Sequence, residues 1–392
     1  MKRTVYLDHS ATTPVKPAVL EAMLPCFTEH FGNASSIHQF GRPNKARITE
    51  ARETLAKTLN AKPEEIYFTA GGTESDNWAL RSIAEAYRSK GNHIITTKIE
   101  HHAILHTCEY LEKNGCEVTY LDVDADGLIS LDALQAAITD KTILISVMFI
   151  NNEIGTMQPI AEIGRIAREK GVLFHTDAVQ AYGNVAIDVN AMNIDLLSLS
   201  AHKIYGPKGI GLLYARQGVR LPSFILGGAQ ERKRRAGTEN VPGIIGFAKA
   251  AELAHADLDA HITHLKTLRD KLIDRVLKEI PYSRLNGHPV HRHPGNANIS
   301  FEFIEGEALL LSLDMVGIAG SSGSACTSGS LDPSHVLMAI GLSHEIAHGS
   351  LRLTIGDSTT EEDIDYTVDQ LKVIVDRLRQ MSPLYEKISG GK

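Results

Sequence analysis

Short apolar runs alternate with helical patterns between about residue 65 and residue 215, and this alternation limits the possible folds more than any other feature. The runs are IYFT, HIITT, EVTYLDV, TILISVMFI, VLFHTDA, LLSLSA and GLLYA. Runs of this kind are typical of buried strands, and helices between successive strands make the strands parallel. We therefore predict a mainly parallel α/β sheet with its functional groups at the strand ends.

One covering helix is predicted with particular clarity, in residues 161–170. Ile163, Ile166 and Ala167 recur there at helical spacing, and Gly171 follows as a stop signal. The chain between two strands therefore has the apolar face that a sheet-covering helix needs.

The sequence after this predicted sheet indicates a second domain. Residues 247–280 contain no Pro or Gly and indicate one long helix or a bent pair of helices that joins two domains. NISFEF and SLRLTI predict strands, and residues 361–379 predict a helix that begins after Thr360. A length of 392 residues is typical of two or three domains.

Composition and charge exclude several classes of function. Hydrophobic residues make up 43% of the chain and charged residues 22%, as in ordinary folded proteins. A net charge of −7 opposes general attraction to nucleic acid or anionic membranes, and the basic run 232–235 favours a solvated loop. No apolar stretch is long enough to span a bilayer, and residues 1–12 lack a secretory signal. We expect a cytoplasmic protein without nucleic-acid or membrane partners.

Three possible metal or disulfide patterns are not supported. HEIAH at 344–348 matches a zinc-protease motif, but Gly349 and a strand follow it at once. DVDADG at 122–127 begins like a calcium loop, but its twelfth position is Ala133 and not Glu. The cysteines lack paired spacing, so we expect reduced thiols and no structural zinc. They are Cys26, Cys108, Cys116 and Cys326.

Lys203 directly follows the apolar strand LLSLS, in the segment SAHKIYGPKG. Desolvation at such a place lowers the pKa of a lysine toward that of a nucleophilic amine, although most lysines are solvated surface groups. Asp177 and Gln180 end another apolar strand and can face the same crevice. A carboxylate there can keep a pyridine nitrogen protonated, while a helix N-cap explains Asp177 equally well.

Further polar residues follow other strands. FTAGGTESDN at 68–77 places Gly72 and Thr73 where backbone N–H groups and a hydroxyl can bind an anion, although a capping box explains Thr73 as well. His101 in IEHHAIL can stack on a planar cofactor. Asn152 in NNEIG is either a hydrogen-bond donor to a ligand or a turn-forming residue.

Cys326 lies in the segment IAGSSGSACTSGS, whose small residues cannot build a core. A cysteine on such a flexible segment can carry sulfur if it becomes a thiolate, or it is a small residue in a linker. Arg352 lies within the apolar strand LRLTI, where it either captures a substrate carboxylate or forms a structural ion pair.

These segments, in this order, resemble the cysteine desulfurases of the NifS/IscS type, within the class-V aminotransferase superfamily. The resemblance covers nearly the whole chain and includes YLDHSATTP, FGNASSIH, GGTESDN, EHHAIL, NNEIG, HTDAVQ, SAHKIYGPKG, RAGTEN, SSGSACTSG and HGSLRLTIG. It implies the fold type I of pyridoxal-phosphate-dependent transferases, with a mainly parallel seven-stranded sheet in a large domain, residues 13–261. Residues 1–12 and 262–392 would form a smaller α+β domain that carries the cysteine loop at about 318–334.

The resemblance also implies roles for individual residues. Lys203 would bind pyridoxal 5′-phosphate covalently, Asp177 would pair with its pyridine nitrogen and His101 would stack on its ring. Thr238 would reach the phosphate from a second subunit, so a homodimer is implied. The other implied cofactor-binding residues are Gly72, Thr73, Asn152, Gln180, Ser200 and His202. The residues implied to bind the substrate are Asn33, Asn152 and Arg352.

The implied reaction converts L-cysteine to L-alanine, with Lys203 as the base at Cα and Cys326 as the acceptor of sulfur in a persulfide. An iron–sulfur scaffold protein is the implied sulfur acceptor. We expect no resident metal, although Cys326 could transiently bind a nascent iron–sulfur cluster. The alternatives are a selenocysteine lyase or aminotransferase of the same superfamily, or a binding protein with an idle cofactor site.

Overall fold

A seven-stranded sheet forms the centre of the larger part of the molecule in this computed structural model, which describes residues 3–322 and 333–389. The strand order is β2-β8-β7-β6-β5-β3-β4, and only β8 runs antiparallel to its neighbours. The predicted mainly parallel sheet is therefore confirmed. The strands are β2 Ile66–Thr69, β3 His93–Thr97, β4 Glu117–Leu121, β5 Thr142–Ser146, β6 Leu173–Asp177, β7 Leu196–Ser200 and β8 Gly211–Ala215.

Helices cover both faces of this sheet because successive strand residues point to opposite sides. Tyr67 packs with α4 and α5 in one apolar cluster, while its neighbour Phe68 packs with α3, α7 and α9 in another. The predicted helix at 161–170 is confirmed as α7, which ends at Gly171 in a left-handed conformation with φ 64°. The covering helices are α3 Arg42–Thr58, α4 Gly72–Ala86, α5 His102–Lys113, α6 Leu131–Ala137, α7 Ile160–Lys170 and α9 Val241–Ala256.

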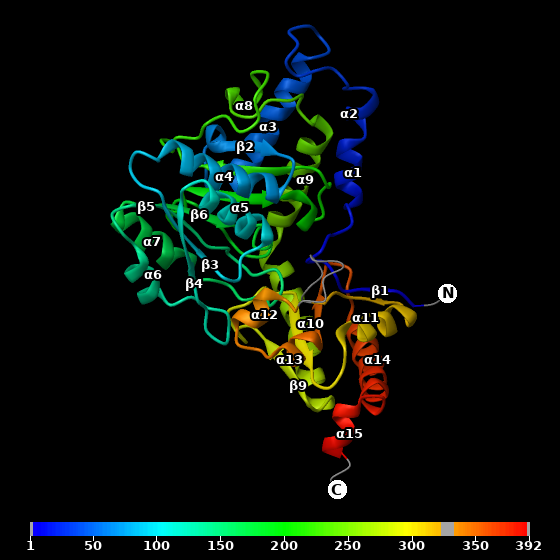
Figure 1. Cartoon of the computed structure of the whole chain (residues 1–392). Helices are drawn as coiled ribbons and strands as arrows, with labels where there is room; N and C mark the ends of the chain where they lie inside the picture. Colours follow the sequence, from blue (N-terminus) through cyan, green and yellow to red (C-terminus); the bar gives the residue numbers. More distant parts are fainter. Residues whose placement is uncertain (1–2, 323–332, 390–392) are drawn as a thin grey trace.

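The predicted helical region 247–280 is a bent pair. Helix α9 ends at Ala256, and α10, Leu258–Glu279, begins after Asp257, whose φ of −143° and ψ of 51° are not helical. The pair leads from the sheet into the C-terminal elements, as Figure 1 shows. The bend turns α10 so that its apolar side, including Leu268, packs in a separate core.

A second core lies around a three-stranded antiparallel sheet of order β12-β10-β9. The predicted strands NISFEF and SLRLTI are confirmed as β10 and β12. The predicted helix at 361–379 is confirmed as α14, which begins with a capping box between Thr360 and Asp363. These elements are β9 Ser283–Asn286, β10 Asn296–Phe301, α11 Gly306–Met315, β12 Ser350–Thr354 and α14 Glu361–Gln380.

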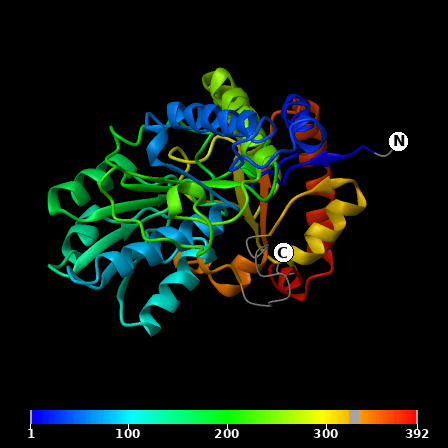
Figure 2. The ribbon, with the colours of Figure 1, turned by 90° about the horizontal axis from the view of Figure 1, so that it is seen from above.

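The N-terminal strand belongs with this second core. Strand β1, Val5–Tyr6, pairs in parallel with β11, Ile318–Ala319. Seen from above, the blue N-terminal segment lies beside the orange and red C-terminal elements (Figure 2). The remaining helical segments are α1 Pro17–Met23, α2 Pro25–Thr28, η1 Pro63–Glu65, η2 Ala201–Lys203, α8 Gln230–Lys233, α12 His335–Ala339, α13 His344–His348 and α15 Pro383–Ser389.

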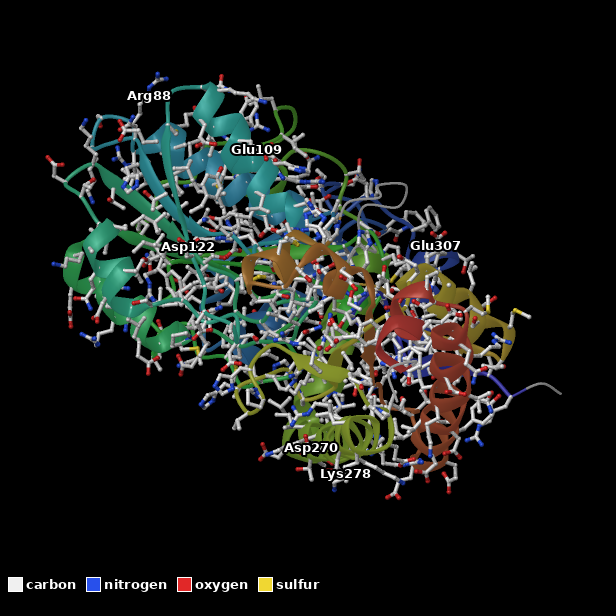
Figure 3. The ribbon with its side chains drawn as sticks, turned by 60° about the horizontal axis from the view of Figure 1, so that its bottom comes forward. Arg88, Glu109, Asp122, Asp270, Lys278 and Glu307 are labelled. Atoms are coloured by element: carbon white, nitrogen blue, oxygen red, sulfur yellow. The ribbon has the colours of Figure 1, made fainter. Side chains whose placement is uncertain are left out.

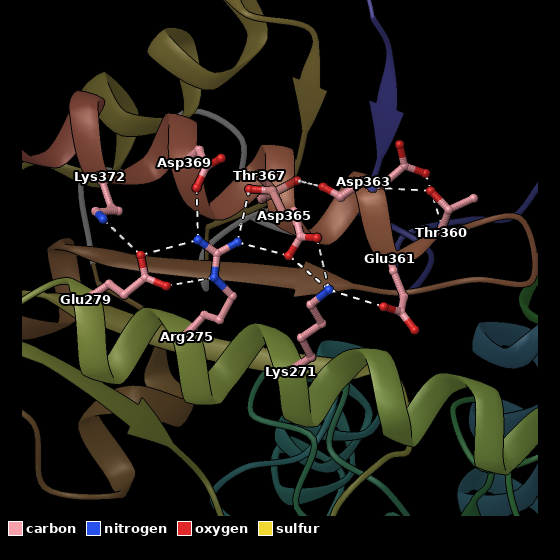
Figure 4. Close-up of polar contacts among 10 residues, drawn as sticks. All are labelled: Lys271, Arg275, Glu279, Thr360, Glu361, Asp363, Asp365, Thr367, Asp369 and Lys372. Atoms are coloured by element: carbon pink, nitrogen blue, oxygen red, sulfur yellow. Dashed lines mark hydrogen bonds and ion pairs between the residues drawn. The ribbon is translucent and has the colours of Figure 1, made fainter.

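Charged side chains connect α10 to α14 along their outer sides (Figure 4). Arg275 of α10 forms ion pairs with Glu279, Asp365 and Asp369 at 2.7, 3.0 and 2.9 Å. Other charged residues of α10, such as Asp270 and Lys278, project outward (Figure 3). The helix therefore uses one side for the core and the other for solvent and ion pairs.

In the basic run 232–235, Arg232 and Lys233 are exposed, as predicted for a solvated segment, but two arginines also contact the protein. Arg232 lies over the ring of Tyr67 at 4.3 Å from the centroid, and Arg235 forms an ion pair with Glu74 at 2.8 Å. Guanidinium groups stack on aromatic faces and pair with carboxylates, so these charges dock against the protein surface. Among the described helices, none is long and apolar enough to cross a membrane.

Candidate active site

A cavity of about 300 Å³ lies at the carboxyl ends of β5, β6 and β7, where the sequence predicted functional groups. The tertiary structure brings most of the predicted site residues together in its wall. Those residues are Gly72, Thr73, His101, Asn152, Asp177, Gln180, Ser200, His202, Lys203 and Arg352.

Lys203 lies in the short helical turn η2 directly after β7. Its Nζ donates hydrogen bonds to the carbonyl oxygens of Ser10 and Ala11, the second at 2.9 Å. The N-terminal segment therefore holds the amine at the cavity. The Ser10 carbonyl also accepts a hydrogen bond from Gln180 Nε2 at 3.0 Å, which orients this second cavity residue.

Asp177 ends β6 and is buried. Its Oδ1 accepts a hydrogen bond from the backbone N–H of Val179 at 2.9 Å, and turns follow in place of a helix, so the N-cap explanation is wrong. Burial raises the pKa of Asp177 to about 6, while the Val179 N–H and the charge of Lys203 oppose that shift. A cation beside this carboxyl group would favour its ionised form further.

The first turn of α4 borders the same cavity. Gly71 is the N-cap residue and none of the described side chains caps the helix, so the capping-box explanation for Thr73 is wrong. A Cβ atom on Gly72 would lie 2.6 Å from Cγ2 of Val179, so the close approach of the helix to the β6 turn requires glycine. Unpaired N–H groups at a helix N-terminus, beside Ser200 and His202, suit a phosphate.

His101 is the N-cap of α5, and its Nδ1 accepts the N–H of Ala103 at 3.1 Å. Burial, followed by the charge of Lys203, lowers the pKa of His101 to about 4. The imidazole is therefore neutral near pH 7, with its proton on Nε2 because Nδ1 is the acceptor. A neutral ring fixed in this way can stack on a planar cofactor.

Arg352 forms the structural ion pair that was one of its two predicted roles, and it also lies in the cavity wall. It lines the cavity, and its Nη2 forms an ion pair with Asp8 at 3.0 Å while its Nη1 donates to the Asn152 carbonyl at 2.9 Å. The ion pair with Asp8 is the structural role predicted for Arg352. It does not exclude the other predicted role, because the guanidinium also lies in the cavity wall, where a substrate carboxylate could bind. A buried guanidinium needs such partners.

Two predicted residues that the structure describes, Asn33 and Thr238, are not brought into this cavity. Asn33 is exposed after α2, and its Oδ1 accepts the N–H of Ser35 at 2.8 Å. Thr238 is exposed between α8 and α9 and is therefore accessible to a second subunit, as its predicted contact requires. Cys326 lies outside the described residues.

Ser10 and Asp76 also line the cavity, although the sequence did not predict a role for either. Both lie in quoted segments, YLDHSATTP and GGTESDN, but neither has a local signal for a site. Ser10 acts through its backbone carbonyl, which any residue could provide. Asp76 is identified only by its burial beside Asp177.

The sheet, a lysine after β7 and a carboxylate at the end of β6 define a transferase of the pyridoxal-phosphate-dependent class. The model of the family "Aminotransferase class-V" matches residues 5–367, and the chain belongs to this family. Its enzymes use pyridoxal 5′-phosphate, and the cavity residues fit that cofactor, with Asp177 near Lys203 and the α4 N-terminus for the phosphate.

Relatives named cysteine desulfurase IscS are similar over the full length. The protein of Clostridium botulinum (strain Hall) is 58% identical over 394 residues, covering 100% of this chain and 99% of its own. That of Methanosarcina thermophila is 59% identical over 385 residues, covering 98% and 95%. Among solved structures, a NifS-like protein has a TM-score of 0.91 at 38% identity, covering 96% of this chain and 100% of that chain.

Proposed function

We propose that the protein is a pyridoxal-phosphate-dependent cysteine desulfurase that converts L-cysteine to L-alanine. Full-length similarity to relatives of that name supports this function. The main structural support for this chemistry is that Lys203 and Asp177 line one cavity at the ends of the adjacent strands β7 and β6. A selenocysteine lyase or an aminotransferase is not favoured, because the similar full-length relatives are named desulfurases.

The cofactor, when bound, accepts the electrons released at Cα of the substrate. Asp177 would pair with its ring nitrogen, Lys203 would bind its aldehyde carbon and His101 would stack on its ring. Its phosphate would lie at the α4 N-terminus near Thr73, where Gly72, Ser200 and His202 also line the cavity. Asn152 and Gln180 would contact the ring and substrate.

Lys203 then acts as the base. Its amine takes the Cα proton of cysteine, and Arg352 binds the substrate carboxylate together with Asn33. The thiolate of Cys326 attacks the substrate sulfur, a new S–S bond forms, and the Cβ–S bond breaks with its electron pair left on carbon. Alanine forms when that carbon gains a proton and Cα regains the proton held by Lys203, and Cys326 keeps the sulfur as a persulfide.

We further propose that two copies of the chain form a dimer. Large apolar side chains are exposed along α2 and the following segment, and the rings of Phe31 and Phe40 stack there with centroids 5.8 Å apart. Exposed apolar clusters mark protein interfaces, and a second copy would also bring Thr238 toward the phosphate of the neighbouring site. The exposed fractions are Leu24 54%, Phe27 58%, Phe31 65%, Ile37 89% and Phe40 54%.

Sedimentation velocity tests the dimer. Ile37→Asp should shift the protein toward monomer, whereas Val290→Asp, at an isolated position that is 70% exposed, should not. A wild-type protein that sediments as a monomer would contradict this proposal.

In the cell, the cytoplasm is the proposed location and an iron–sulfur scaffold protein is the proposed acceptor of the persulfide sulfur. A transient bond from Cys326 to a nascent cluster would be part of that transfer. A purified scaffold protein should gain sulfur from the wild-type enzyme and cysteine, but not from Cys326→Ser.

The reaction is tested with purified protein, its visible spectrum and assays of alanine and sulfide after addition of cysteine. A yellow protein that forms alanine and sulfide only when Cys326 is present supports the proposal. Cys326→Ala should keep the cofactor absorbance and lose sulfide release, and Cys116→Ala is the matched control. Full sulfide release from Cys326→Ala would exclude the persulfide route, and a colourless protein would favour the binding-protein alternative.

A further inference from the structure

A second carboxyl group lies beside Asp177 in the wall of the proposed cofactor cavity. Asp76 of α4 is 1% exposed, and among the described residues its Oδ1 has no hydrogen-bond partner. A buried carboxyl oxygen without a partner is costly when it is ionised. Packing alone therefore does not explain why a carboxyl group is buried at position 76.

Within the described part of the chain, the groups around Asp76 do not supply a positive charge. His175 of β6 is the nearest candidate, with Nε2 3.7 Å from Asp76 Oδ1, but its ring nitrogens hydrogen-bond to the hydroxyls of Ser146 and Ser198 at 2.8 and 3.0 Å. Burial lowers the pKa of His175 to about 3, so this ring is neutral near pH 7.

The remaining charged neighbours are negative or face Asp177. Asp177 adds negative potential at Asp76, Glu100 does so when it is ionised, and Lys203 interacts with Asp177. Burial, with the charge of Asp177 as the second cause, raises the pKa of Asp76 well above its usual value, although a hydrogen bond with Ser198 opposes the shift. When two buried carboxyl groups share a site, one of them retains a proton.

We propose that Asp76 stores one proton in the cofactor-free protein and releases it to the ring nitrogen when pyridoxal 5′-phosphate binds. This inference rests on the proposed function. The O–H bond of Asp76 breaks and the N–H bond of the pyridine ring forms, so no electrons are gained or lost. The protonated ring then supplies a positive charge beside the carboxylates of Asp76 and Asp177. The described part of the free protein has no such charge to compensate both of them.

Proton storage has a measurable consequence in binding. At alkaline pH an unprotonated ring nitrogen can take its proton from Asp76 in the wild type, but only from the solvent in Asp76→Asn. The variant should therefore take up more protons from the buffer as it binds the cofactor. Its dissociation constant for the cofactor should also rise relative to the wild type between pH 6 and pH 9, by at most about tenfold per pH unit, since the two proteins differ by one proton taken up.

Calorimetric titration of the cofactor-free full chain with pyridoxal 5′-phosphate tests this idea, in two buffers of different ionisation enthalpy at pH 8. The expected result is greater proton uptake by Asp76→Asn than by the wild type. Asp76→Ser removes the same carboxyl group and should behave alike if Asp76→Asn fails to fold. Equal proton uptake by the wild type and both variants would overturn the proposal.

Glu100→Gln is the matched control, because Glu100 is an equally buried carboxyl group outside the cavity wall. It should show the proton uptake of the wild type. If it alone showed greater uptake, Glu100 would hold the proton and the assignment to Asp76 would be wrong. A wild-type protein that binds no cofactor at all would contradict the proposed function instead, which keeps the two failures distinct.

Thermal unfolding of the cofactor-free proteins gives an independent readout. A carboxyl group whose folded-state pKa is raised contributes stability that is lost as the pH rises through that pKa. Asn does not titrate, so the melting temperature of Asp76→Asn minus that of the wild type should increase between pH 5 and pH 9. A constant difference over this range would show that Asp76 does not hold the proton.

Discussion

Nη2 of Arg352 lies 3.0 Å from Oδ1 of Asp8, and this ion pair links β12 to the N-terminal segment at the edge of the cavity. The same guanidinium donates to the carbonyl of Asn152 at 2.9 Å, so three distant segments meet at one side chain. Its Nε has no hydrogen-bond partner among the described residues. The arrangement fixes the guanidinium while leaving it able to bind a carboxylate.

Replacing Arg352 with Lys should raise the KM for cysteine by about 10- to 100-fold, because hydrogen bonds to charged groups contribute about 1.5–3 kcal/mol. Steady-state kinetics measures this change. Arg284→Lys, on the exposed side of β9, is the matched control and should have a normal KM. An unchanged KM in Arg352→Lys would restrict Arg352 to its structural ion pair.

Replacing Lys203 with Ala should reduce the rate of alanine formation by on the order of 10²–10⁴-fold, because the base at Cα is lost. The absorbance of the covalently bound cofactor should disappear as well. Lys98→Ala, which removes an exposed lysine paired with Asp122, should change neither property. Retention of turnover in Lys203→Ala would assign the proton transfer to another residue.

Replacing Glu100 with Gln should change how stability depends on pH. Burial raises the pKa of Glu100 to about 8, despite hydrogen bonds from the Met148 N–H and the Thr97 hydroxyl. The wild type therefore loses stability as the pH rises from about 4.5, the unfolded value, through 8. The free energy of unfolding of the variant minus that of the wild type should rise by at most about 1.4 kcal/mol per pH unit.

Chemical denaturation of both proteins between pH 5 and pH 9 measures this difference. A difference that does not vary with pH would mean that Glu100 is ionised throughout. Glu109→Gln, at an exposed position on α5, provides the control for the substitution itself.

Replacing Arg275 with Met should lower the melting temperature at low salt, because it removes three ion pairs between and within α10 and α14. Hydrogen bonding to Arg275 and Lys372 lowers the pKa of Glu279 to about 2, as expected for a networked carboxylate. The effect should shrink in 1 M salt, where exposed charges are screened. Arg165→Met breaks an isolated exposed pair and should have a smaller effect, and equal effects would contradict a networked contribution.

The alternation of apolar runs was enough to predict the sheet and the helix at 161–170. A β-strand buried on both faces and a helix with one apolar face each leave a local pattern, and so do stop and capping signals such as Gly171 and Thr360. The motifs also indicated Lys203 and Asp177 as candidate site residues, because Asp177 ends its strand and Lys203 lies in the turn after its strand.

Local patterns could not decide what a side chain does after folding. The alternatives for Asp177, Thr73 and Arg352 differ only in which distant groups surround each residue, and the tertiary structure supplied those groups. Arg352 and Asp8 are separated by most of the chain, yet they form an ion pair. The sequence also left open whether residues 247–280 form one helix or two. The tertiary structure decides this with a bend at Asp257, because α9 packs in the first core and α10 in the second.

The sequence by itself therefore determined the elements, their alternation and the types of reactive residue, because short-range sterics and hydrophobic periodicity are local. Only the tertiary structure decided that Asp76 and Asp177 share one buried wall and that Ser10 holds Lys203 through a backbone carbonyl. Protonation depends on burial and on neighbouring charges, and both are properties of the packed chain.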